Sequence, residues 1–508
     1  MCNYKRLLNI TIYYNNEAKG EQRMKRRAFL ASLCLILAIG SIILVMRSAA
    51  GSTTAQSILS SQGTIAPLTA KYIVQSDGLG GYSTINSLGQ TVQYGIDAAN
   101  LINNAFGNLT VGGEVLLNGN FTVASPIIPS SYSTLYINGT ITLANFAPPP
   151  IPIIDVDNKT EVNIIGGRIE GNSANQYQDV YYTDIGIYIT DGSTYCTVSD
   201  VYINDCMPYC MVVGNSWGNS LTAVSDVNVT NCVFNNGRDN CFSIDCSQGS
   251  TYPVTNVLVS NCQAMNGSDY GFDVYGTYAS NITFSDCIAY SIVADRSDGG
   301  GNMSTGFGLE WGCHDITLTN CVTHGQAAGF AVVNGAHDIT IINPTIYDLS
   351  GYYSNGSHPW PVGILVEPTS YNVEVDGGTI SNVQQRAINV KGAGTTVNDV
   401  TISDVTFYDG IATGINMEDQ GNNSVIQNCL ISNCPSYGIL IWAVNNTSIY
   451  DTVTASCGCG ISEAGGADYT FISNSTNSNN GYTQTSWAAH SRLSGNIGWA
   501  DYPVQQQG

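Results

Sequence analysis

The sequence predicts an all-β fold, a single-stranded right-handed parallel β-helix (solenoid) of about 11–12 coils, because two short patterns recur together. The first, Val/Ile-x-Val/Ile-x-Asn/Asp-Cys, occurs at residues 227–232, 257–262, 282–287 and 316–321. The second, Gly-Phe/Ile-x-Val/Ile or a close variant, follows each copy, as at 271–274 and 306–309. Repeats roughly 23 to 34 residues apart with alternating apolar residues indicate coils that bury their apolar face only by stacking. No 3.6-residue periodicity intervenes, which excludes leucine-rich and helical repeats.

The N-terminal residues predict export. Ala28–Met46 is free of charged residues and follows Lys25-Arg26-Arg27, which favours a transmembrane anchor with its N-terminus inside. A cleaved secretory signal is the alternative, because Met24 could be the true start and 48–50 resembles a cleavage site. Both alternatives make the remainder extracellular, either at the cell surface on a single-pass anchor or secreted.

Changes in composition divide the chain into five expected segments, from the N-terminus to the C-terminus. They are a cytoplasmic leader or mis-assigned start at 1–27, the anchor or signal segment at 28–47, a Ser/Thr/Gly-rich stalk at 48–85, the β-helix at 86–480, and a C-terminal tail or cap at 481–508. A helical pattern at Tyr94–Ile102 predicts a short helix that caps the first coil, covering strand edges that would otherwise aggregate.

Composition limits the partners. Of the 508 residues only 11% are charged and 43% are hydrophobic, which is typical of a folded protein, and the net charge of −22 argues against nucleic-acid binding. Asn-x-Ser/Thr sequons are dense, but many arise by chance in an Asn- and Thr-rich chain, so a glycoprotein is one of two interpretations. The sequons include Asn108, Asn120, Asn138, Asn158, Asn228, Asn266, Asn281, Asn302, Asn355, Asn422, Asn445 and Asn474.

Sixteen cysteines in an exported protein would ordinarily suggest disulfides. Five of them share one repeat position and would stack about 4.8 Å apart, which suits bridges between coils or, as we favour, a ladder of buried thiols. These five are Cys232, Cys262, Cys287, Cys321 and Cys429. Cys206/Cys210 and Cys457/Cys459 have metal-like spacing but lack clustered histidines, so we expect no zinc site and no cofactor.

The second pattern places three carboxylates on one outward face. Counting alternate residues puts Asp245, Asp273 and Glu310 on three neighbouring coils. Carboxylates one coil apart repel each other, which raises the pKa of at least one of them, as a general acid requires. Asp245 and Glu310 would lie about 9.6 Å apart along the stack, near the upper end of the carboxyl spacing in inverting glycosidases. We therefore predict an acid/base site.

Aromatic and charged residues accompany these carboxylates. Tyr275 and Trp311 offer flat faces on which a sugar ring could stack, and Arg238 and Asp239 lie on a turn that enters the strands. Two other interpretations stay open. Outward positions are polar by default, so the acids can gather by chance, and facing carboxylates also suit a Ca²⁺ ion.

Family resemblance adds to this pattern. The order of a helix, Gly-Gly-x-Val-x-Leu at 112–117 and then coils resembles the pectate-lyase-like β-helix superfamily, from about residue 86 to 480. The resemblance implies the fold alone, since that fold hosts lyases, hydrolases, epimerases, tailspikes and adhesins.

Two shorter resemblances concern the site. Tyr270-Gly271-Phe272-Asp273 is similar to the opening of Tyr-Gly-Phe-Asp-Pro-His in mannuronan C5-epimerases, which implies catalytic roles for Tyr270, Asp273 and Glu310. Val274 and Tyr275 stand where that family has Pro and His. Residues 238–244 resemble the Asp-Asp-Cys segment of polygalacturonases, with Asn240 in place of one acid.

These features predict a protein that acts on a polysaccharide or cell-surface glycan, as a glycoside hydrolase. A non-catalytic glycan-binding protein, adhesin or virion surface protein is the first alternative, and a uronate C5-epimerase or lyase is the second. The second is disfavoured because a uronate carboxylate must be neutralised, and only Arg238 and the distant Lys391 are cationic on this face. An enzyme would also need loops as groove walls, for which 297–301 and 351–361 are the candidates.

Overall fold

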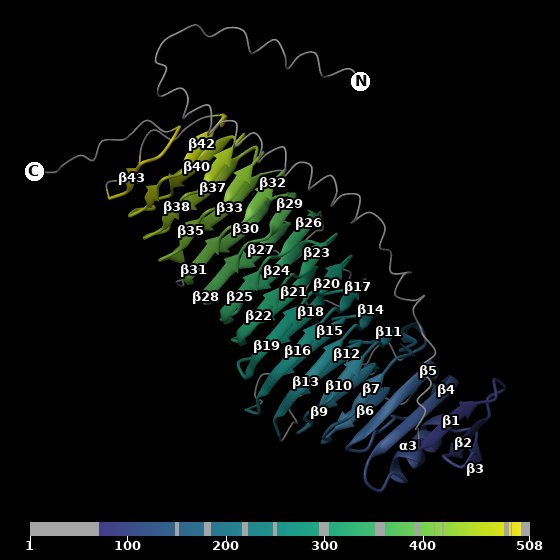
Figure 1. Cartoon of the computed structure of the whole chain (residues 1–508). Coiled ribbons are helices and arrows are strands. Elements are labelled where there is room, and N and C mark those ends of the chain that lie inside the picture. The colour runs from purple at the N-terminus through teal and green to yellow at the C-terminus, as the bar shows by residue number, and fades with distance from the viewer. Residues whose placement is uncertain are drawn as a thin grey trace, which may run out of the picture. The chain divides into compact units, whose positions relative to one another are not determined.

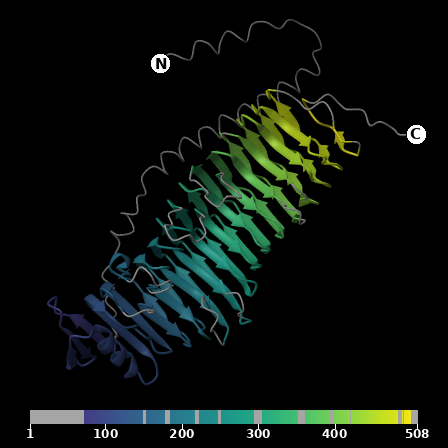
Figure 2. The same ribbon diagram turned by 180° about the vertical axis from the view of Figure 1, so that it is seen from behind.

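A computed structural model describes most of the chain after residue 70. The described residues are 71–147, 152–176, 184–215, 222–246, 251–293, 304–350, 361–391, 397–410, 412–418, 421–481, 487–488 and 490–498. They form a solenoid of stacked parallel strands, the fold that the repeats predict (Figure 1 and Figure 2). The expected leader, anchor or signal segment and the stalk up to residue 70 lie outside the described residues. Within the described ranges, no helix has the length and apolar character needed to span a bilayer.

One sheet of the solenoid contains a strand from each repeat of the Gly-Phe/Ile pattern. In the described part of the chain it has twelve parallel strands, in agreement with the expected number of coils. In chain order they are β6 (Ile154–Asp157), β9 (Ile187–Thr190), β12 (Met211–Asn215), β15 (Phe242–Cys246), β18 (Tyr270–Tyr275), β21 (Thr305–Glu310), β24 (Ala328–Val332), β27 (Val362–Val366), β30 (Arg386–Lys391), β33 (Thr413–Glu418), β37 (Tyr437–Trp442) and β40 (Cys459–Ala464). We call it the twelve-stranded sheet.

The other described strands belong to one larger sheet of 31 strands. In chain order they are β1 (Tyr72–Ser76), β2 (Tyr82–Asn86), β3 (Thr91–Gly95), β4 (Gly113–Val123), β5 (Ser133–Leu143), β7 (Asn163–Ile165), β8 (Arg168–Glu170), β10 (Thr197–Ser199), β11 (Tyr202–Cys206), β13 (Val224–Thr230), β14 (Val233–Gly237), β16 (Val254–Ser260), β17 (Gln263–Met265), β19 (Ala279–Ser285), β20 (Ile288–Tyr290), β22 (His314–Thr319), β23 (Val322–His324), β25 (His337–Ile342), β26 (Thr345–Leu349), β28 (Tyr371–Asp376), β29 (Thr379–Val383), β31 (Val397–Ser403), β32 (Thr406–Tyr408), β34 (Gly421–Asn422), β35 (Val425–Gln427), β36 (Leu430–Ser432), β38 (Ser448–Tyr450), β39 (Val453–Ala455), β41 (Phe471–Ser473), β42 (Thr476–Ser478) and β43 (Arg492–Ser494). We call it the larger sheet.

A typical coil therefore has three strands, where the sequence patterns indicated two. The Asn/Asp-Cys pair of the first pattern forms the bend between the first two strands, as at Asn231 between β13 and β14. Asn231, Asn261, Asp286 and Asn320 all have φ between 51° and 55°, the left-handed conformation that Asn and Asp tolerate better than other non-glycine residues. The following cysteine then turns into the core.

Phenylalanine rings form the centre of the core beside the predicted site. Phe272, Phe307 and Phe330 come from β18, β21 and β24 and are fully buried. Their rings stack in sequence, with centroids 4.9 Å apart in both pairs. Stacking at the strand spacing ties each coil to the next and fixes the register of the strands that carry the site.

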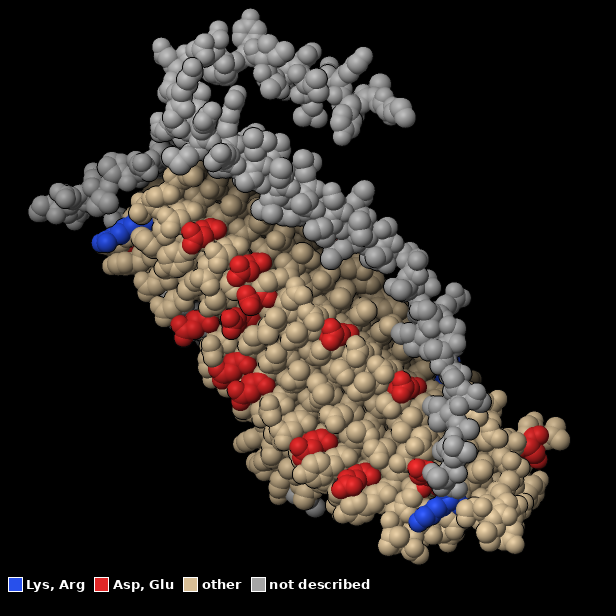
Figure 3. Space-filling model, in the orientation of Figure 1, with Lys and Arg blue, Asp and Glu red and all other residues tan. Residues whose placement is uncertain are grey.

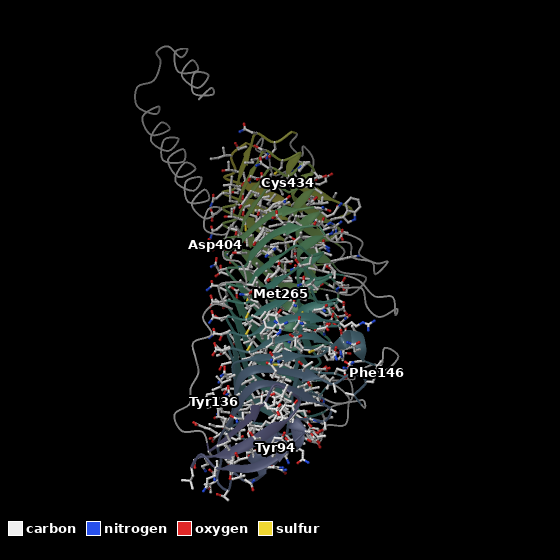
Figure 4. The ribbon with its side chains drawn as sticks, turned by 90° about the vertical axis from the view of Figure 1, so that its right-hand side faces the viewer. Tyr94, Tyr136, Phe146, Met265, Asp404 and Cys434 are labelled. Atoms are coloured by element: carbon white, nitrogen blue, oxygen red, sulfur yellow. The ribbon has the colours of Figure 1, made fainter. Side chains whose placement is uncertain are left out.

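All fourteen described cysteines are buried free thiols, which agrees with the ladder that the sequence favoured over disulfides. Cys232 and Cys262 illustrate the ladder, since the Cys232 backbone N–H lies 3.4 Å from the Cys262 sulfur on the next coil. In Figure 4, Met265 lies midway along the stack, Tyr94 at its N-terminal end and Cys434 towards its C-terminal end.

At the N-terminal end the solenoid begins earlier than expected. The stalk was expected to continue to residue 85, which is wrong for residues 72–85, because they form β1 and most of β2. β1 pairs in parallel with β4, and β1, β2 and β3 form an antiparallel meander. The nearby helix α3 (Ala98–Gly107) begins later than the helical pattern suggested, because Asp97 is its N-cap, accepting a hydrogen bond from the Asn100 N–H. Its expected role as a cap on the first coil stays a prediction.

The C-terminal tail also differs from the expectation. Residues after 480 were expected to lose the repeat, yet β43 pairs in parallel with β41 and adds a further rung. The pattern was missed because only Leu493 of this short strand is apolar.

Candidate functional site

The three predicted carboxylates lie on adjacent strands of the twelve-stranded sheet. Asp245 is on β15, Asp273 on β18 and Glu310 on β21, and each alternates with inward core residues. Asp245 and Glu310 are both register partners of Tyr275, so these three residues form one outward column. Asp273 belongs to the neighbouring column and faces Ser243 on one side and Gly308 on the other.

The carboxylates are more buried than expected. The columns were expected to form one exposed patch, but Asp245, Asp273 and Glu310 are only 9%, 5% and 7% exposed. The ring of Tyr270, itself buried, gives one physical reason, because it lies directly against the backbone of Gly308 and reaches Glu310. The site is thus a buried polar cluster on the outward side of the sheet.

Asp273 lies at the centre of this cluster with one oxygen bound and one not. Its Oδ2 accepts hydrogen bonds of 3.0 Å from Asn240 Nδ2 and from Ser243 Oγ. Its Oδ1 is buried and has no hydrogen-bond partner among the described residues. A buried polar atom without a partner is destabilising, so its retention is a reason to look for a ligand or a reacting group at that oxygen.

Glu310 is held by a phenol. The Tyr270 hydroxyl donates a hydrogen bond to Glu310 Oε1. Gly308 makes this contact possible, because a Cβ atom at that position would overlap the Tyr270 ring. Tyr270 therefore reaches from β18 across β21 to orient the carboxyl group.

Burial and the charges of neighbouring carboxylates alter the protonation of both groups. The pKa of Asp273 is raised well above its ordinary value of 3.8, first by burial and then by the charges of Glu310 and Asp245. Burial raises the pKa of Glu310 from 4.5 to about 7, against the Tyr270 hydrogen bond, which lowers it. A carboxyl group whose surroundings favour its protonated form therefore lies beside a carboxyl group that titrates near neutral pH.

Two aromatic residues border the cluster. Tyr275 is partly buried and Trp311 is 43% exposed, with ring centroids 6.0 Å apart and planes inclined by 47°. Trp311 has a φ of 56°, a conformation that costs a bulky residue roughly 1–2 kcal/mol. Non-glycine residues with positive φ also occur at bends along the whole described solenoid, so the expected role of Trp311 rests on its exposed ring and not on its backbone.

The two other predicted binding residues lie on the turn before β15. Arg238 is exposed, and its guanidinium Nη1 lies 3.1 Å from the Met207 sulfur. Asp239 is buried, and its backbone carbonyl accepts a 2.9 Å hydrogen bond from the Asp269 N–H in the next turn. The charge of Asp269 further raises the pKa of Asp273, so the turn before β18 adds negative potential to the site.

Asn240, Ser243 and Gly308 contact the site residues and were not predicted. Asn240 and Ser243 bind Asp273, and Gly308 accommodates Tyr270. Ser243 and Gly308 could have been found, because both occupy the same outward column as Asp273 in the adjacent coils.

Two expectations about the surroundings stay open. The proposed groove walls at 297–301 and 351–360 lie outside the described residues. Over the described ranges, no group of three or more His, Cys, Asp or Glu residues is arranged to hold a metal ion. Calcium binding, which the sequence left open, therefore stays an untested alternative.

Comparison with known proteins identifies the fold. The family described as "Right handed beta helix region" matches residues 186–346 and 349–497, which is more than half of the chain. Pre-mature gene product 12 of bacteriophage phi29 is 14% identical over 80% of this chain and 55% of its own, with a TM-score of 0.54. The A-module of the Azotobacter vinelandii mannuronan C-5 epimerase AlgE6 is 14% identical over 80% of this chain and 96% of its own, with a TM-score of 0.43.

A tailspike protein variant of E. coli bacteriophage HK620, solved in complex with a pentasaccharide, is 13% identical over 81% of this chain and 77% of its own, with a TM-score of 0.45. At such identities the likeness extends to the fold alone. No curated protein matches the chain significantly. The family match and the stacked parallel strands together show that the chain belongs to the right-handed β-helix family.

Proposed function

We propose that the protein is an exported glycoside hydrolase whose acid and base are Asp273 and Glu310. The observation that carries the proposal is the buried Asp273 Oδ1, which has no hydrogen-bond partner among the described residues and lies beside a second carboxyl group of raised pKa. Pairs of carboxyl groups whose surroundings separate their pKa values are the hallmark of acid/base catalysis.

The roles follow from the protonation states. Asp273, neutral because its pKa is raised, donates its proton to the glycosidic oxygen as that bond breaks. Glu310, ionised above a pH of about 7 and held by Tyr270, takes a proton from the water whose oxygen attacks the anomeric carbon. One water molecule is consumed, and each half of the cleaved glycan leaves with a hydroxyl group.

The strand geometry is compatible with the inverting form of this reaction. Asp273 and Glu310 lie on neighbouring strands two residues out of register, which separates their Cα atoms by roughly 8 Å. Inverting enzymes need about 6.5–9.5 Å between carboxyl groups, to leave room for a water molecule. Asp245, in the same column as Glu310, supports the site by raising the pKa of Asp273.

Charge favours a neutral glycan as substrate. Within the described strands of the twelve-stranded sheet, the cationic residues are Arg386 and Lys391, both on β30. A C5-epimerase or lyase would have to neutralise a uronate carboxylate beside Asp273 and Glu310, which makes that alternative the less favoured one. Tyr275 and Trp311 are suited to stack on a sugar ring at the rim.

The low exposure of the carboxylates supports a second candidate function. With Asp245, Asp273 and Glu310 each less than 10% exposed, the cluster also suits a surface or virion protein that binds glycans without cleaving them. Export, on a retained anchor at 28–46 or by a cleaved signal, rests on the sequence alone.

The test is a panel of neutral and acidic polysaccharides incubated with the protein, with products identified by mass spectrometry. We expect cleavage of a neutral glycan, and a loss of about 100-fold or more in rate for Asp273→Asn and for Glu310→Gln. Glu374→Gln is the matched control, because Glu374 is exposed on the larger sheet. Cleavage by Asp273→Asn and Glu310→Gln at the wild-type rate would refute the assignment. If the wild-type protein binds a glycan without cleaving it, the second candidate is favoured.

A further inference from the structure

A second polar cluster lies on the outward side of the twelve-stranded sheet, on β30 and β33. It consists of Arg386, Asn389, Asn416 and Glu418, and we call it the amide cluster. Asn389 is 4% exposed and Asn416 is 1% exposed, although both alternate with core residues and face outward. Neither candidate function proposed above uses these residues.

Hydrogen bonds fix the side chains of the amide cluster. Asn389 Oδ1 accepts hydrogen bonds from Arg386 Nη1 at 2.9 Å and from Asn416 Nδ2 at 2.8 Å. Arg386 Nη1 also contacts Glu418 Oε1 at 2.9 Å. Two planar amides, a guanidinium group and a carboxylate are thus held in one network, which orients their remaining donors and acceptors in advance.

An exposed indole lies on the next rung. Trp442 on β37 is the register partner of Glu418 and is 47% exposed. It lies against Gly465, where a Cβ atom would come within 2.7 Å of the indole nitrogen. The indole therefore rests on backbone, with an open face beside the amide cluster.

This surface is separate from the acid cluster. Glu310 on β21 and Trp442 on β37 are five strand spacings apart, which corresponds to about 24 Å along the stack. The outward residues of the two strands between β21 and β30 are apolar and buried, among them Ala331 and Leu365. In the column that holds Glu310, Val333 is also apolar and buried, and Glu367, which follows β27, is the acid that lies between the two clusters and raises the pKa of Glu310.

We propose that the outward face of β30, β33 and β37 is a second glycan-binding site, which holds neutral sugar residues without cleaving them. The Arg386 guanidinium, which Asn389 holds in place and whose side chain is 30% exposed, matches the paired hydroxyls of a pyranose, and the indole face matches its apolar C–H face. Glu418 contacts Arg386, and Lys391, the register partner of Glu418, lies one strand from Glu367, so two carboxylates balance the two cations of this face. Hydroxyl groups rather than carboxylates are therefore the ligand class. The inference shares with the proposed function only the class of ligand, and it does not require hydrolysis.

The test measures binding in the Glu310→Gln background, so that cleavage does not interfere. The probes are galactomannan, xyloglucan and soluble starch as neutral polymers, with alginate and polygalacturonate as acidic ones. We expect at least one neutral polymer to bind, and Trp442→Ala and Arg386→Ala each to weaken that binding tenfold or more. Tyr371→Ala is the matched control, because Tyr371 is an exposed aromatic residue on the larger sheet, and it should bind normally.

Further measurements separate this proposal from the hydrolase assignment. Trp442→Ala in the otherwise wild-type protein should cleave short soluble oligosaccharides with unchanged kcat and KM, and Trp442→Phe should retain much of the binding. The second site is overturned if Trp442→Ala binds as tightly as its parent, if no neutral polymer binds, or if the acidic polymers bind more tightly. Failure of the hydrolase assignment would show elsewhere, as unchanged cleavage by Glu310→Gln.

Discussion

Glu310 combines opposing influences in a single side chain. Burial disfavours its ionised form, whereas the hydrogen bond from Tyr270 favours it, and the resulting pKa is about 7. For Asp273 the hydrogen bond from Ser243 also favours the ionised form, but burial and the charges of Glu310 and Asp245 outweigh it, and Oδ1 has no partner among the described residues. Because the charge of Glu310 raises the pKa of Asp273, loss of the Glu310 proton near pH 7 favours the proton on Asp273, and this one-proton state is the one that the proposed reaction requires.

The rate of glycan cleavage should follow these two groups. Activity should rise with pH as Glu310 ionises near pH 7, and fall at higher pH as Asp273 loses its proton. The hydrogen bond from Tyr270 lowers the pKa of Glu310, so its removal in Tyr270→Phe should raise that pKa and move the acidic limb of the profile above pH 7. The check is the pH dependence of kcat/KM for both proteins. An acidic limb that stays in place, or moves to lower pH, would contradict this role for Tyr270.

Sequence reasoning could find the acids of the site but not their burial. Alternation with period two places Asp245, Asp273 and Glu310 on the outward face, and the observed register agrees. Exposure depends on what lies over a strand, and the Tyr270 ring over Gly308 is a contact across the register that no periodicity encodes. Asn240 was noted only as a departure from a family motif, whereas its contact with Asp273 depends on the path of a turn.

At the scale of the element, the bend after each Asn or Asp explains the commonest repeat residue. The sequence shows Asn-Cys or Asp-Cys at a fixed position, which indicates only that a polar residue is preferred there. The structure adds the reason, a backbone φ near 55°. Ladders of side chains reinforce these bends, as where Asn320 Nδ2 donates to Asp286 Oδ1 at 3.1 Å and Asn343 Nδ2 donates to Asn320 Oδ1 at 2.8 Å. The bend separates two strands, which is why two strands per coil were expected where three are found.

Asn261 offers a test of the bend between β16 and β17. Its φ is 51°, so Asn261→Ala should destabilise the fold by roughly 1 kcal/mol or more, because alanine lacks the tolerance of Asn for the left-handed region. Asn261→Gly should be close to neutral, since glycine adopts this conformation without a steric penalty. Denaturant unfolding of the three proteins provides the comparison. Equal losses for Ala and Gly would show that side-chain contacts, not φ, account for the choice of Asn.

Strand order and core were predictable, because the inward residues repeat with the coils, whereas the ends of the solenoid were not. β1 and β2 lie in a segment rich in Ser, Thr and Gly, and β43 follows a break in the period. Terminal rungs have a neighbour on one side only, so their sequences need not match both faces of the repeat. The terminal strands are consequently recognised from their backbone pairing in the structure, as between β43 and β41, and not from a repeat in the sequence.

At the scale of the whole molecule, negative charge is the dominant property. The formal net charge is −22, and Figure 3 shows acidic side chains along the face in view with few Lys or Arg among them. The larger sheet carries most of its acids at exposed bends, where solvent screens them. The outward side of the twelve-stranded sheet is different, because most of its acids are partly or fully buried, Asp157 at the end of β6 being exposed. Burial raises the pKa of Asp155, also on β6, to about 6.

Buried carboxyl groups with raised pKa values make the stability of the solenoid depend on pH. A carboxyl group whose pKa is higher in the folded than in the unfolded chain stabilises the fold while protonated, and that contribution disappears as the pH rises through the folded pKa. For Glu310 the interval runs from about 4.5 to about 7, corresponding to roughly 3 kcal/mol, and Asp155 and Asp273 act in the same direction. Self-repulsion of the net charge adds to the loss at high pH. The melting temperature should therefore be higher at pH 5 than at pH 8.

The variant Glu310→Gln separates the local part of this effect from the global one. An uncharged amide cannot ionise on folding or unfolding, so the difference in melting temperature between pH 5 and pH 8 should shrink relative to the wild type. Glu374→Gln removes an equal charge from an exposed position of the larger sheet, and should leave that difference nearly unchanged. Calorimetric scans of the three proteins across this pH range make the comparison. If both variants shrink the difference equally, net charge and not the burial of Glu310 determines how the solenoid responds to pH.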